Sequence, residues 1–312
     1  MISDETLLSV AIAYYMQHKT QVEIAKDLHV SHVQIGKYLK EAMRRGIVSI
    51  QVNLPIAKEE EESLKTIFKT LFSLKNLVLT QGSENSDKSH RHVVAKATAY
   101  LLENYPDIET RIGLGWGRTM RDIALSPNPM GKKENWIYSP LCMLSSPVVD
   151  NPYYDSATMV RTMARNWGGK ANESLVDMME MMRHGHSDKL MKQCRTQWQK
   201  NSMLICGMGC ATSRYPLPRK AMFPEGRFEE INTKSLVGDI LHNFYDVEGH
   251  LFPAAGYDVM IPLEDIRQTP LVVAVASGFS KVESIIGGLR TGLVDTLVTD
   301  VQTAHHVIEY LK

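Results

Sequence analysis

The chain has 312 residues, with 35 Lys and Arg and 35 Asp and Glu, so its formal net charge is zero. This balance excludes a uniformly basic coat, and any contact with nucleic acid has to be local. Hydrophobic residues make up 44% and charged residues 22% of the chain, which excludes wholesale disorder. The length suits two domains, or one large α/β domain with a small appendage.

Cysteine usage and the N-terminus indicate the compartment. The four cysteines (Cys142, Cys194, Cys206 and Cys210) are too few and too scattered for a disulfide framework, which favours a reducing environment. Acidic residues precede the first apolar stretch, whereas a secretory signal begins with basic ones. Because no apolar run approaches the ~20 residues that cross a bilayer, we expect a cytoplasmic protein without membrane association.

The first 55 residues show the pattern of a helix-turn-helix. A capping box over residues 20–23 predicts one helix start, and a second box over residues 31–34 predicts another. His29 occupies the turn, where a left-handed backbone is expected, and Gly46 is expected to end the second helix. Residues 47–53 then alternate with period two, as a wing-like strand does.

The second of these helices carries groups that suit DNA. Residues 19–45 contain six basic and three acidic residues, and this local excess lies where phosphate contacts are needed. We expect His32 and Gln34 to read base edges, and Lys37 and Lys40 to contact phosphates. The candidate DNA contacts are Ser31, His32, Gln34, Lys37, Tyr38 and Lys40. Two alternatives remain open: a packing-only helical cap, or an oligomerisation module.

The remaining chain has a different pattern of apolar residues. A charged run at residues 57–64 leads into apolar residues at helical spacing, which predicts a linker helix. Beyond it, short apolar runs alternate with longer amphipathic ones, the pattern of an α/β fold. The predicted domains are a winged helix-turn-helix over residues 1–55, a linker helix over 56–74, and an effector-binding and oligomerisation domain over 75–312.

A glycine-rich loop follows one predicted strand. Gly113, Gly115 and Gly117 allow a backbone to approach a ligand, Thr119 is expected to cap the next helix, and Arg118 adds positive charge. Amides at a helix start, a hydroxyl and a guanidinium together suit a phosphate or a hydroxyl-rich ligand. Close helix–strand packing accounts for the glycines equally well.

Three other features favour ordinary packing. In the second glycine-rich turn, Cys206 and Cys210 lack another Cys/His pair at zinc-finger spacing, so we expect buried thiols. The Met-rich stretch at residues 177–186 is interpreted as adaptable core or interface rather than a copper or haem site. His305 and His306 are interpreted as surface or packing residues.

The C-terminal segment predicts a βαβ unit, with strands at residues 271–276 and 294–299. A capping box over residues 280–283 places Lys281 at the first helical position, where the helix dipole repels a positive charge. A bound anion relieves that repulsion, whereas a solvated surface lysine is the alternative. Asp300 is expected to cap the last helix.

In this order and spacing, four stretches resemble the SorC-type family of bacterial transcription regulators; they are residues 21–48, 112–119, 238–249 and 272–300. The resemblance implies an α/β fold: an N-terminal winged helix-turn-helix plus a larger doubly wound, mostly parallel-sheet sugar-binding domain, similar to ribose-phosphate isomerase and glucosamine-phosphate deaminase. It also implies a regulator of a carbohydrate-utilisation operon, such as one for sorbose or sorbitol. The implied partners are double-stranded operator DNA, a sugar or sugar phosphate, and further copies of the chain, usually as a tetramer.

The resemblance also implies an effector site. The loop at 115–119 would hold phosphate or sugar oxygens, Asp239 would accept from sugar hydroxyls, and Lys281 would donate to phosphate or hydroxyl. Trp116 is suited to stacking on a sugar face. The implied effector contacts are Gly115, Trp116, Gly117, Arg118, Thr119, Gly207, Gly209, Asp239 and Lys281. No catalytic residue, metal or cofactor is implied.

The competing hypothesis is a sugar-phosphate isomerase or deaminase, because the implied fold hosts both activities. Such an enzyme needs a carboxylate or a histidine beside the reacting carbon. Asp239 and Asp246 are available, but no paired acid and base can be read from the sequence.

Overall fold

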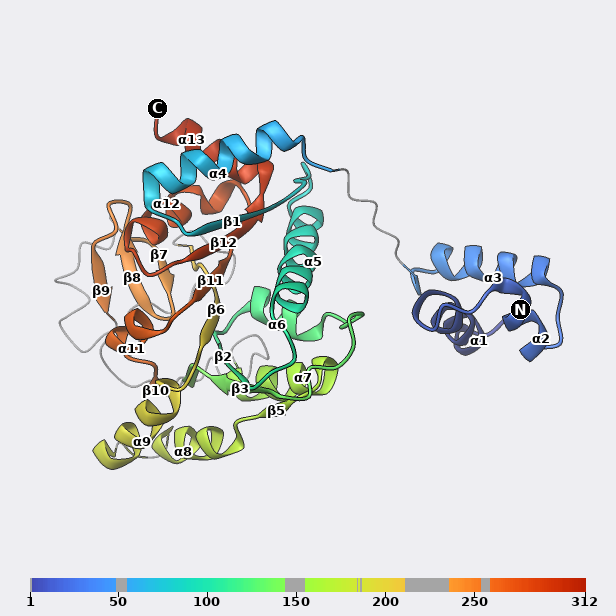
Figure 1. The fold of residues 1–312 in the computed structure, drawn as a ribbon, viewed down its shortest axis with the longest axis horizontal. Helices are drawn as coiled ribbons and strands as arrows, with labels where there is room; N and C mark the ends of the chain where they lie inside the picture. Colours follow the sequence, from blue (N-terminus) through green and yellow to red (C-terminus); the bar gives the residue numbers. More distant parts are fainter. Residues whose placement is uncertain are drawn as a thin grey trace. The chain divides into compact units, whose positions relative to one another are not determined.

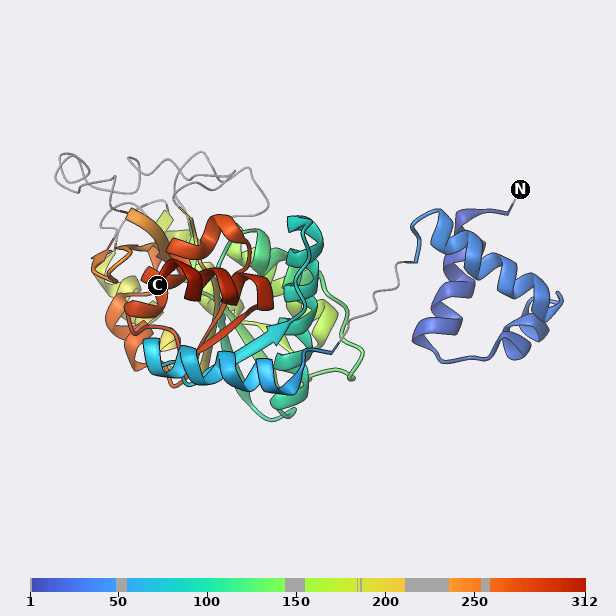
Figure 2. The ribbon, with the colours of Figure 1, turned by 90° about the horizontal axis from the view of Figure 1, so that it is seen from above.

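The computed structural model describes residues 2–48, 55–143, 155–183, 185, 187–210, 236–253 and 259–312. The chain divides into two compact units, residues 1–54 and residues 55–312, both drawn in Figures 1 and 2. Among the described residues, no helix combines the length and apolar character needed to cross a membrane.

The described part of the smaller unit contains three helices and a π-helical turn that extends the first of them. They are α1 (Asp4–Ala11), the π turn (Ile12–Met16), α2 (Gln21–Asp27) and α3 (His32–Arg44). Val10, Ile24 and Ile35 contribute one buried side chain from each helix to a shared core. Apolar residues at helical spacing therefore hold the three helices together.

Polar side chains start α2 and α3 as the sequence predicts. Thr20 forms a full capping box: its hydroxyl accepts from the N–H of Glu23, whose carboxylate accepts from the N–H of Thr20 at 2.7 Å. Ser31 makes the first half of the second predicted box by accepting from the N–H of Gln34 at 3.2 Å. The start of each helix is thus fixed by local chemistry.

Helix α3 ends in a Schellman motif, which confirms Gly46 as its stop. Gly46 has a φ of 74°, its N–H donates to the carbonyl oxygen of Met43 at 3.1 Å, and the N–H of Ile47 donates to that of Ala42 at 2.9 Å. The wing-like strand predicted at residues 47–53 lies mostly outside the described residues and stays a prediction.

The larger unit is built on a seven-stranded sheet in which every strand pairs in parallel with its neighbours. The order is β1-β12-β11-β6-β2-β3-β5. The strands are β1 (Asn76–Thr80), β2 (Thr110–Leu114), β3 (Trp136–Pro140), β5 (Lys170–Ala171), β6 (Met203–Gly207), β11 (Val272–Val275) and β12 (Thr296–Asp300). The predicted C-terminal βαβ unit is confirmed as β11, α12 and β12.

Helices flank this sheet, with α4, α12 and α13 on one side and α5, α6 and α7 on the other (Figure 1). The strand order explains the two layers, because the chain moves outward from β2 to β5 in one direction and from β6 to β12 in the other. The helices are α4 (Lys58–Phe72), α5 (Ser86–Asn104), α6 (Arg118–Leu125), α7 (Ser156–Trp167), α8 (Glu173–Arg183), α9 (Asp188–Trp198), α11 (Leu263–Gln268), α12 (Val282–Arg290) and α13 (Val301–Tyr310). The doubly wound, mostly parallel fold class is confirmed.

Helix α4 occupies the segment predicted as a linker, yet it packs on the larger unit. Leu64 and Phe68 are buried in the same core as the sheet. The Glu60 carboxylate accepts from His305 Nε2 of α13 at 2.8 Å, and the ring of His306 packs against Phe279 with centroids 5.2 Å apart. Both histidines therefore make surface or packing contacts, as predicted.

Two small antiparallel sheets complete the larger unit. One contains β7 (Leu236–Ile240), β8 (Asn243–Asp246) and β9 (Leu251–Pro253), and the other pairs β4 (Cys142–Met143) with β10 (Val259–Met260). Tyr245 of β8 joins the first of these sheets to α12 through a 3.0 Å hydrogen bond to Ser284. This contact brings the β7–β8 hairpin to the start of α12.

Candidate functional site

The first candidate site is the solvent face of α3. Ile35, Leu39 and Ala42 of this helix are buried, and on the opposite face Lys37 and Lys40 are exposed. The turn before the helix has the predicted form, since His29 adopts a φ of 53°. The helix thus offers a fixed polar surface of the kind that enters a major groove.

Val33 belongs to the same exposed surface and was missed by the sequence analysis. It lies one helical turn before Lys37 on one stripe of α3, and 56% of its surface is exposed. An apolar side chain at this end of a recognition helix suits contact with the methyl group of thymine. The sequence did contain a signal, because Val33 does not lie on the stripe of apolar residues that α3 buries.

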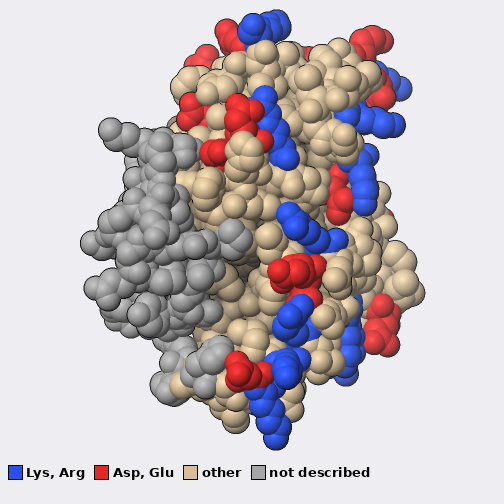
Figure 3. Space-filling model, turned by 90° about the vertical axis from the view of Figure 1, so that its left-hand side faces the viewer, with Lys and Arg blue, Asp and Glu red and all other residues tan. Residues whose placement is uncertain are grey.

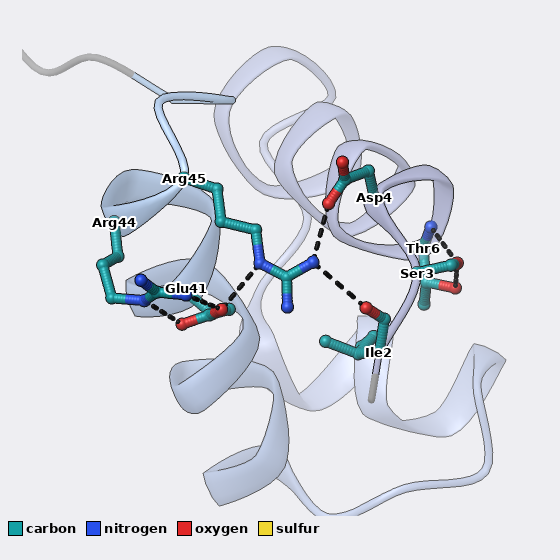
Figure 4. Close-up of polar contacts among 7 residues, drawn as sticks. All are labelled: Ile2, Ser3, Asp4, Thr6, Glu41, Arg44 and Arg45. Carbon is teal, nitrogen blue, oxygen red and sulfur yellow. Dashed lines mark hydrogen bonds and ion pairs between the residues drawn. The ribbon is translucent and has the colours of Figure 1, made fainter.

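Ion pairs inside the smaller unit remove part of the basic excess that the sequence displays. Glu41 accepts from both Arg44 and Arg45 at 2.6 Å, and Arg45 also reaches Asp4 at 2.7 Å (Figure 4). These two guanidinium groups lower the pKa of Glu41 to about 2. Arg45 therefore braces the end of α3 against the start of α1, while Arg44 pairs within α3.

Three lysines are left to meet phosphates. Lys19 is paired with Asp27 at 2.8 Å, whereas Lys26, Lys37 and Lys40 have no ion pair among the described residues. Figure 3 views the larger unit, and there the coloured basic side chains are interspersed with acidic ones. The unpaired cations of the smaller unit thus centre on α3.

The other predicted DNA contacts differ in accessibility. His32 is exposed in the first turn of α3, and Gln34 is half-buried. Ser31 uses its hydroxyl to cap the helix. Tyr38 is half-buried against the core of the smaller unit, so its ring braces the helix and the direct-contact role predicted for it stays a prediction.

The second candidate site lies at the carboxyl edge of the large sheet, between β2 and β6. These strands are neighbours, and the direction of the strand order reverses between them. Open α/β sheets bind ligands in the crevice at such a reversal. The loop after β2 carries Gly115–Thr119 and the turn after β6 carries Gly207–Gly209, so both predicted loops meet at this point.

The loop after β2 leads directly into α6. The helix begins at Arg118, and Gly117 precedes it with a φ of 98° and no side-chain cap. The prediction that Thr119 caps this helix is wrong, because Thr119 is already the second helical residue. The amides at the start of α6 are consequently not satisfied by a capping side chain, which suits an anion.

The three glycines of this loop serve different purposes. A Cβ atom on Gly113 would overlap Leu141 and Leu204, and one on Gly115 would come within 3.0 Å of Leu241. The N–H of Gly115 donates to the carbonyl oxygen of Ile205 at 2.8 Å. Close packing of neighbouring side chains therefore explains the glycines at positions 113 and 115, and approach of a ligand does not. The sequence alone had left this alternative open. A Cβ on Gly117 would meet open space, but its positive φ favours glycine.

The turn after β6 is held tightly against the β7–β8 hairpin. The N–H of Gly209 donates to the carbonyl oxygen of Asp239 at 2.8 Å, and the carbonyl oxygen of Gly209 accepts from Ser284. A side chain at position 209 would overlap the carboxylate of Asp239. Gly207 faces Thr119 across an ordinary van der Waals distance. The predicted residues of the two loops are thus brought together with Asp239.

Lys281 reaches the same place by a different route from the one predicted. A 3₁₀ turn, Phe279–Lys281, precedes α12, so Lys281 is the residue before the helix and no side chain caps it. The predicted capping box at 280–283 is wrong for this reason. The Lys281 ammonium donates to the carbonyl oxygen of Met208. Burial lowers its pKa, nearby Cys210 and Asp239 raise it, and Arg118 lowers it further.

Two helix starts and two cations therefore converge at one edge of the sheet. The helices that follow β1 and β12 are capped by Asn85 and Asp300, the latter as predicted. Those that follow β2 and β11 have no side-chain cap, and these are the helices that begin beside Arg118 and Lys281. Arg118 lies 3.6 Å from Asp87, with both side chains exposed. This arrangement can hold an anion through amides and charge.

The wall of this site contains a histidine that the sequence analysis missed. Trp116 packs against His242 with ring centroids 4.8 Å apart, and the backbone N–H of His242 donates to the Asp239 carboxylate at 3.3 Å. His242 is fully buried, and burial lowers its pKa to about 3. Its place in the matched stretch 238–249 was the available signal.

The residues considered for catalysis or metal binding make contacts that stabilise the fold. Asp246 pairs with His250 at 2.9 Å and lies at the far end of the hairpin from Asp239, so the two carboxylates do not form an acid–base pair. Burial raises the pKa of Cys206 to about 12. In the Met-rich segment, Met179 and Met182 are buried in the core, while His184 and His186 lie outside the described residues.

Comparison with known proteins gives consistent relationships. Residues 58–309 match the family profile described as "Putative sugar-binding domain". The chain is 25% identical to the sorbitol operon regulator of Klebsiella pneumoniae, over 98% of this chain and 99% of that one. It is 24% identical to the deoxyribonucleoside regulator of Bacillus subtilis, over 97% of each.

Solved structures show the same fold. The full-length sorbitol operon regulator SorC from Klebsiella pneumoniae superposes with a TM-score of 0.69 at 22% identity, covering 99% of both chains. A transcriptional regulator from Streptococcus pneumoniae superposes with a TM-score of 0.60 at 24% identity, covering 80% of this chain and 97% of that one. Because the family profile spans most of the chain and full-length relatives are named transcriptional regulators, the chain belongs to the sugar-binding-domain family of SorC-type transcription regulators that its motifs resemble.

Proposed function

We propose that this protein is a DNA-binding transcription regulator of a carbohydrate-utilisation operon, and that a sugar or sugar phosphate modulates its binding to operator DNA. The observation that carries the proposal is the convergence of Arg118, Lys281 and two uncapped helix starts at the strand-order reversal, in a chain that also has a helix-turn-helix. The cytoplasm, where operator DNA and sugar phosphates meet, is the compartment that this function needs.

In the smaller unit, α3 is the recognition helix. His32 and Gln34 read base edges, with Val33 added as an apolar contact. Lys37 and Lys40 bind phosphates and fix the position of the helix. The residue 1–55 winged helix-turn-helix and the residue 75–312 effector domain keep the roles that the sequence predicts, and α4 belongs with the effector domain.

In the effector site, the start of α6 with Arg118 and Thr119 binds the anionic part of the effector, and Lys281 donates to it from the start of α12. Asp239 accepts from sugar hydroxyls. Trp116 packs on the sugar face. Gly207 and Gly209 leave the room that these groups need, and Gly115 contributes through packing.

Effector binding acts through a population shift. The effector binds more tightly to one arrangement of a homo-oligomer, a tetramer in our proposal, and so changes how the DNA-binding units meet the operator. A coupling free energy of about 1–3 kcal/mol is enough for a useful switch. Sorbitol, sorbose and their phosphate esters are the first effectors to test, because a sorbitol operon regulator is among the relatives.

A thermal-shift screen of sugars and sugar phosphates tests the effector half of this proposal. A compound at about 100 times its Kd stabilises the folded state by about 2.7 kcal/mol, which raises Tm by about 5–10 °C for a domain of this size. A compound that raises the Tm of the wild-type protein should no longer raise it when Lys281 is replaced. If no sugar or sugar phosphate shifts Tm, the proposed effector class is wrong.

The enzyme hypothesis is disfavoured. The relatives are named regulators, and the two candidate carboxylates lie at opposite ends of one hairpin. Turnover of a sugar phosphate by the purified protein, abolished in Asp239→Asn, would reverse this conclusion.

A further inference from the structure

The hairpin turn between β7 and β8 has an unusual backbone. Its two central residues, Leu241 and His242, both have positive φ, 49° and 62°. Such a turn normally contains Asn or Gly, because a side chain at positive φ crowds the neighbouring carbonyl. Both residues are nevertheless bulky and buried. Strained positions of this kind cluster at ligand-binding sites, where the side chain has a use that glycine cannot supply.

The His242 side chain also lacks the partners that a buried polar group needs. Both ring nitrogens are buried and have no hydrogen-bond partner in the part of the chain that the structure describes. The carbonyl oxygens of Ile240 and Leu241 in the turn accept from the Asn243 amide at 3.2 Å and 3.0 Å. Buried polar groups are nearly always satisfied, so a pair of unsatisfied nitrogens marks a position where a partner is missing.

The position of the ring identifies that partner. The ring of His242 lies against Trp116 of the loop after β2. The backbone N–H of His242 donates to the Asp239 carboxylate. Both neighbours belong to the candidate effector site. A neutral imidazole has one donor and one acceptor nitrogen, which matches the donor and acceptor capacity of neighbouring hydroxyl groups on a polyol chain.

We propose that His242 is a specificity-determining residue of the effector site, whose two ring nitrogens hydrogen-bond to hydroxyl groups of a sugar or polyol phosphate. The inference rests on the proposed function and names a contact that it does not contain. Because the ring has no exposed surface, the effector reaches it when the half-buried indole of Trp116 moves off His242 and onto the sugar face.

The displacement of Trp116 provides an optical signal. The other three tryptophans, Trp136, Trp167 and Trp198, are fully buried, so a change in tryptophan emission on titration reports mainly on Trp116. We expect sorbitol phosphate to change the emission of the full-length protein, and Trp116→Phe to abolish that change. Unchanged emission on saturation, with binding shown by calorimetry, would overturn the displacement.

The decisive variant is His242→Gly, because glycine suits the backbone of the turn. We expect the variant to fold, because glycine adopts the positive φ without strain, and its affinity for sorbitol phosphate to fall by about ten-fold or more. His242→Asn, which tolerates positive φ and keeps an amide donor and acceptor, should lose less affinity. His18→Gly is the matched control: it makes the same substitution at another positive-φ histidine (φ 55°) in the smaller unit, and should leave effector affinity unchanged.

Calorimetry on the full chain uses sorbitol, sorbose, their phosphate esters and inorganic phosphate. It distinguishes failure of the role of His242 from failure of the proposed effector class. If Lys281→Met weakens binding of a phosphate ester and His242→Gly binds it within two-fold of the wild type, this inference is wrong and the proposed effector site stands. If the wild-type protein binds none of these compounds, the proposed effector class fails, and this inference fails with it.

Discussion

Replacing Lys281 with methionine removes the cation that the proposed effector site presents at the start of α12. The ammonium donates to the Met208 carbonyl and shares its surroundings with Asp239, Cys210 and Arg118. Methionine keeps most of the side-chain length and apolar stem. The substitution therefore removes charge from the site without opening a large cavity.

The magnitude follows from the interaction that is lost. A hydrogen bond to a charged group contributes about 1.5–3 kcal/mol, so we expect affinity for a sugar phosphate to fall by about 10- to 150-fold. Folding stability should change by only about 1 kcal/mol, because one hydrogen bond is lost while a buried charge is also removed. Calorimetric titration with sorbitol phosphate measures the first quantity, and urea unfolding measures the second.

The control is Lys75→Met, which removes the same charge at the amino edge of the same sheet. Lys75 is exposed and paired with Asp295 at 2.7 Å, so this variant should bind sorbitol phosphate as the wild type does. Equal affinity of Lys281→Met and wild type would show that the site is misplaced. Equal losses in both variants would show that net charge alone governs binding.

Three further outcomes are expected. Gly209→Ala forces a methyl group onto the Asp239 carboxylate, so it should weaken effector binding and cost about 1–3 kcal/mol of stability; unchanged calorimetry would contradict this. Lys37→Ala should weaken operator binding and lower the salt dependence by about one counterion, measured by anisotropy. Because burial depresses the pKa of His242 from 6.5 to about 3, the unfolded state binds its proton first, and the free energy of unfolding falls by about 1.4 kcal/mol per pH unit as pH decreases from 6.5 toward 3; urea unfolding of His242→Gly should show a flatter profile.

The features predictable from the sequence are those set by local chemistry. The caps at Thr20 and Asp300 and the glycine stop at position 46 depend on residues within one helical turn. The parallel sheet follows from alternating apolar runs. The family motifs also indicated both loops that meet at the candidate effector site, because each loop directly follows its strand.

Other features depend on contacts between distant segments. The capping box predicted at 280–283 has suitable residues, but the 3₁₀ turn before α12 moves the helix start past Ser280. Gly113 and Gly115 resemble ligand-approach glycines, and only the three-dimensional packing of Leu204 and Leu241 against them shows their role. The ion pair of Arg45 likewise uses Asp4 from a different helix. The matched stretch 238–249 contains His242, but its burial and its positive φ appear only in the structure.

The central claim is that effector and operator binding are coupled within one chain. Fluorescence anisotropy with operator DNA, with and without saturating sorbitol phosphate, measures this directly. We predict that the effector changes the operator Kd by about 5- to 150-fold, and that Lys281→Met binds operator normally without this response. Operator isotherms that superimpose in the presence of an effector that calorimetry shows to be bound would contradict the account.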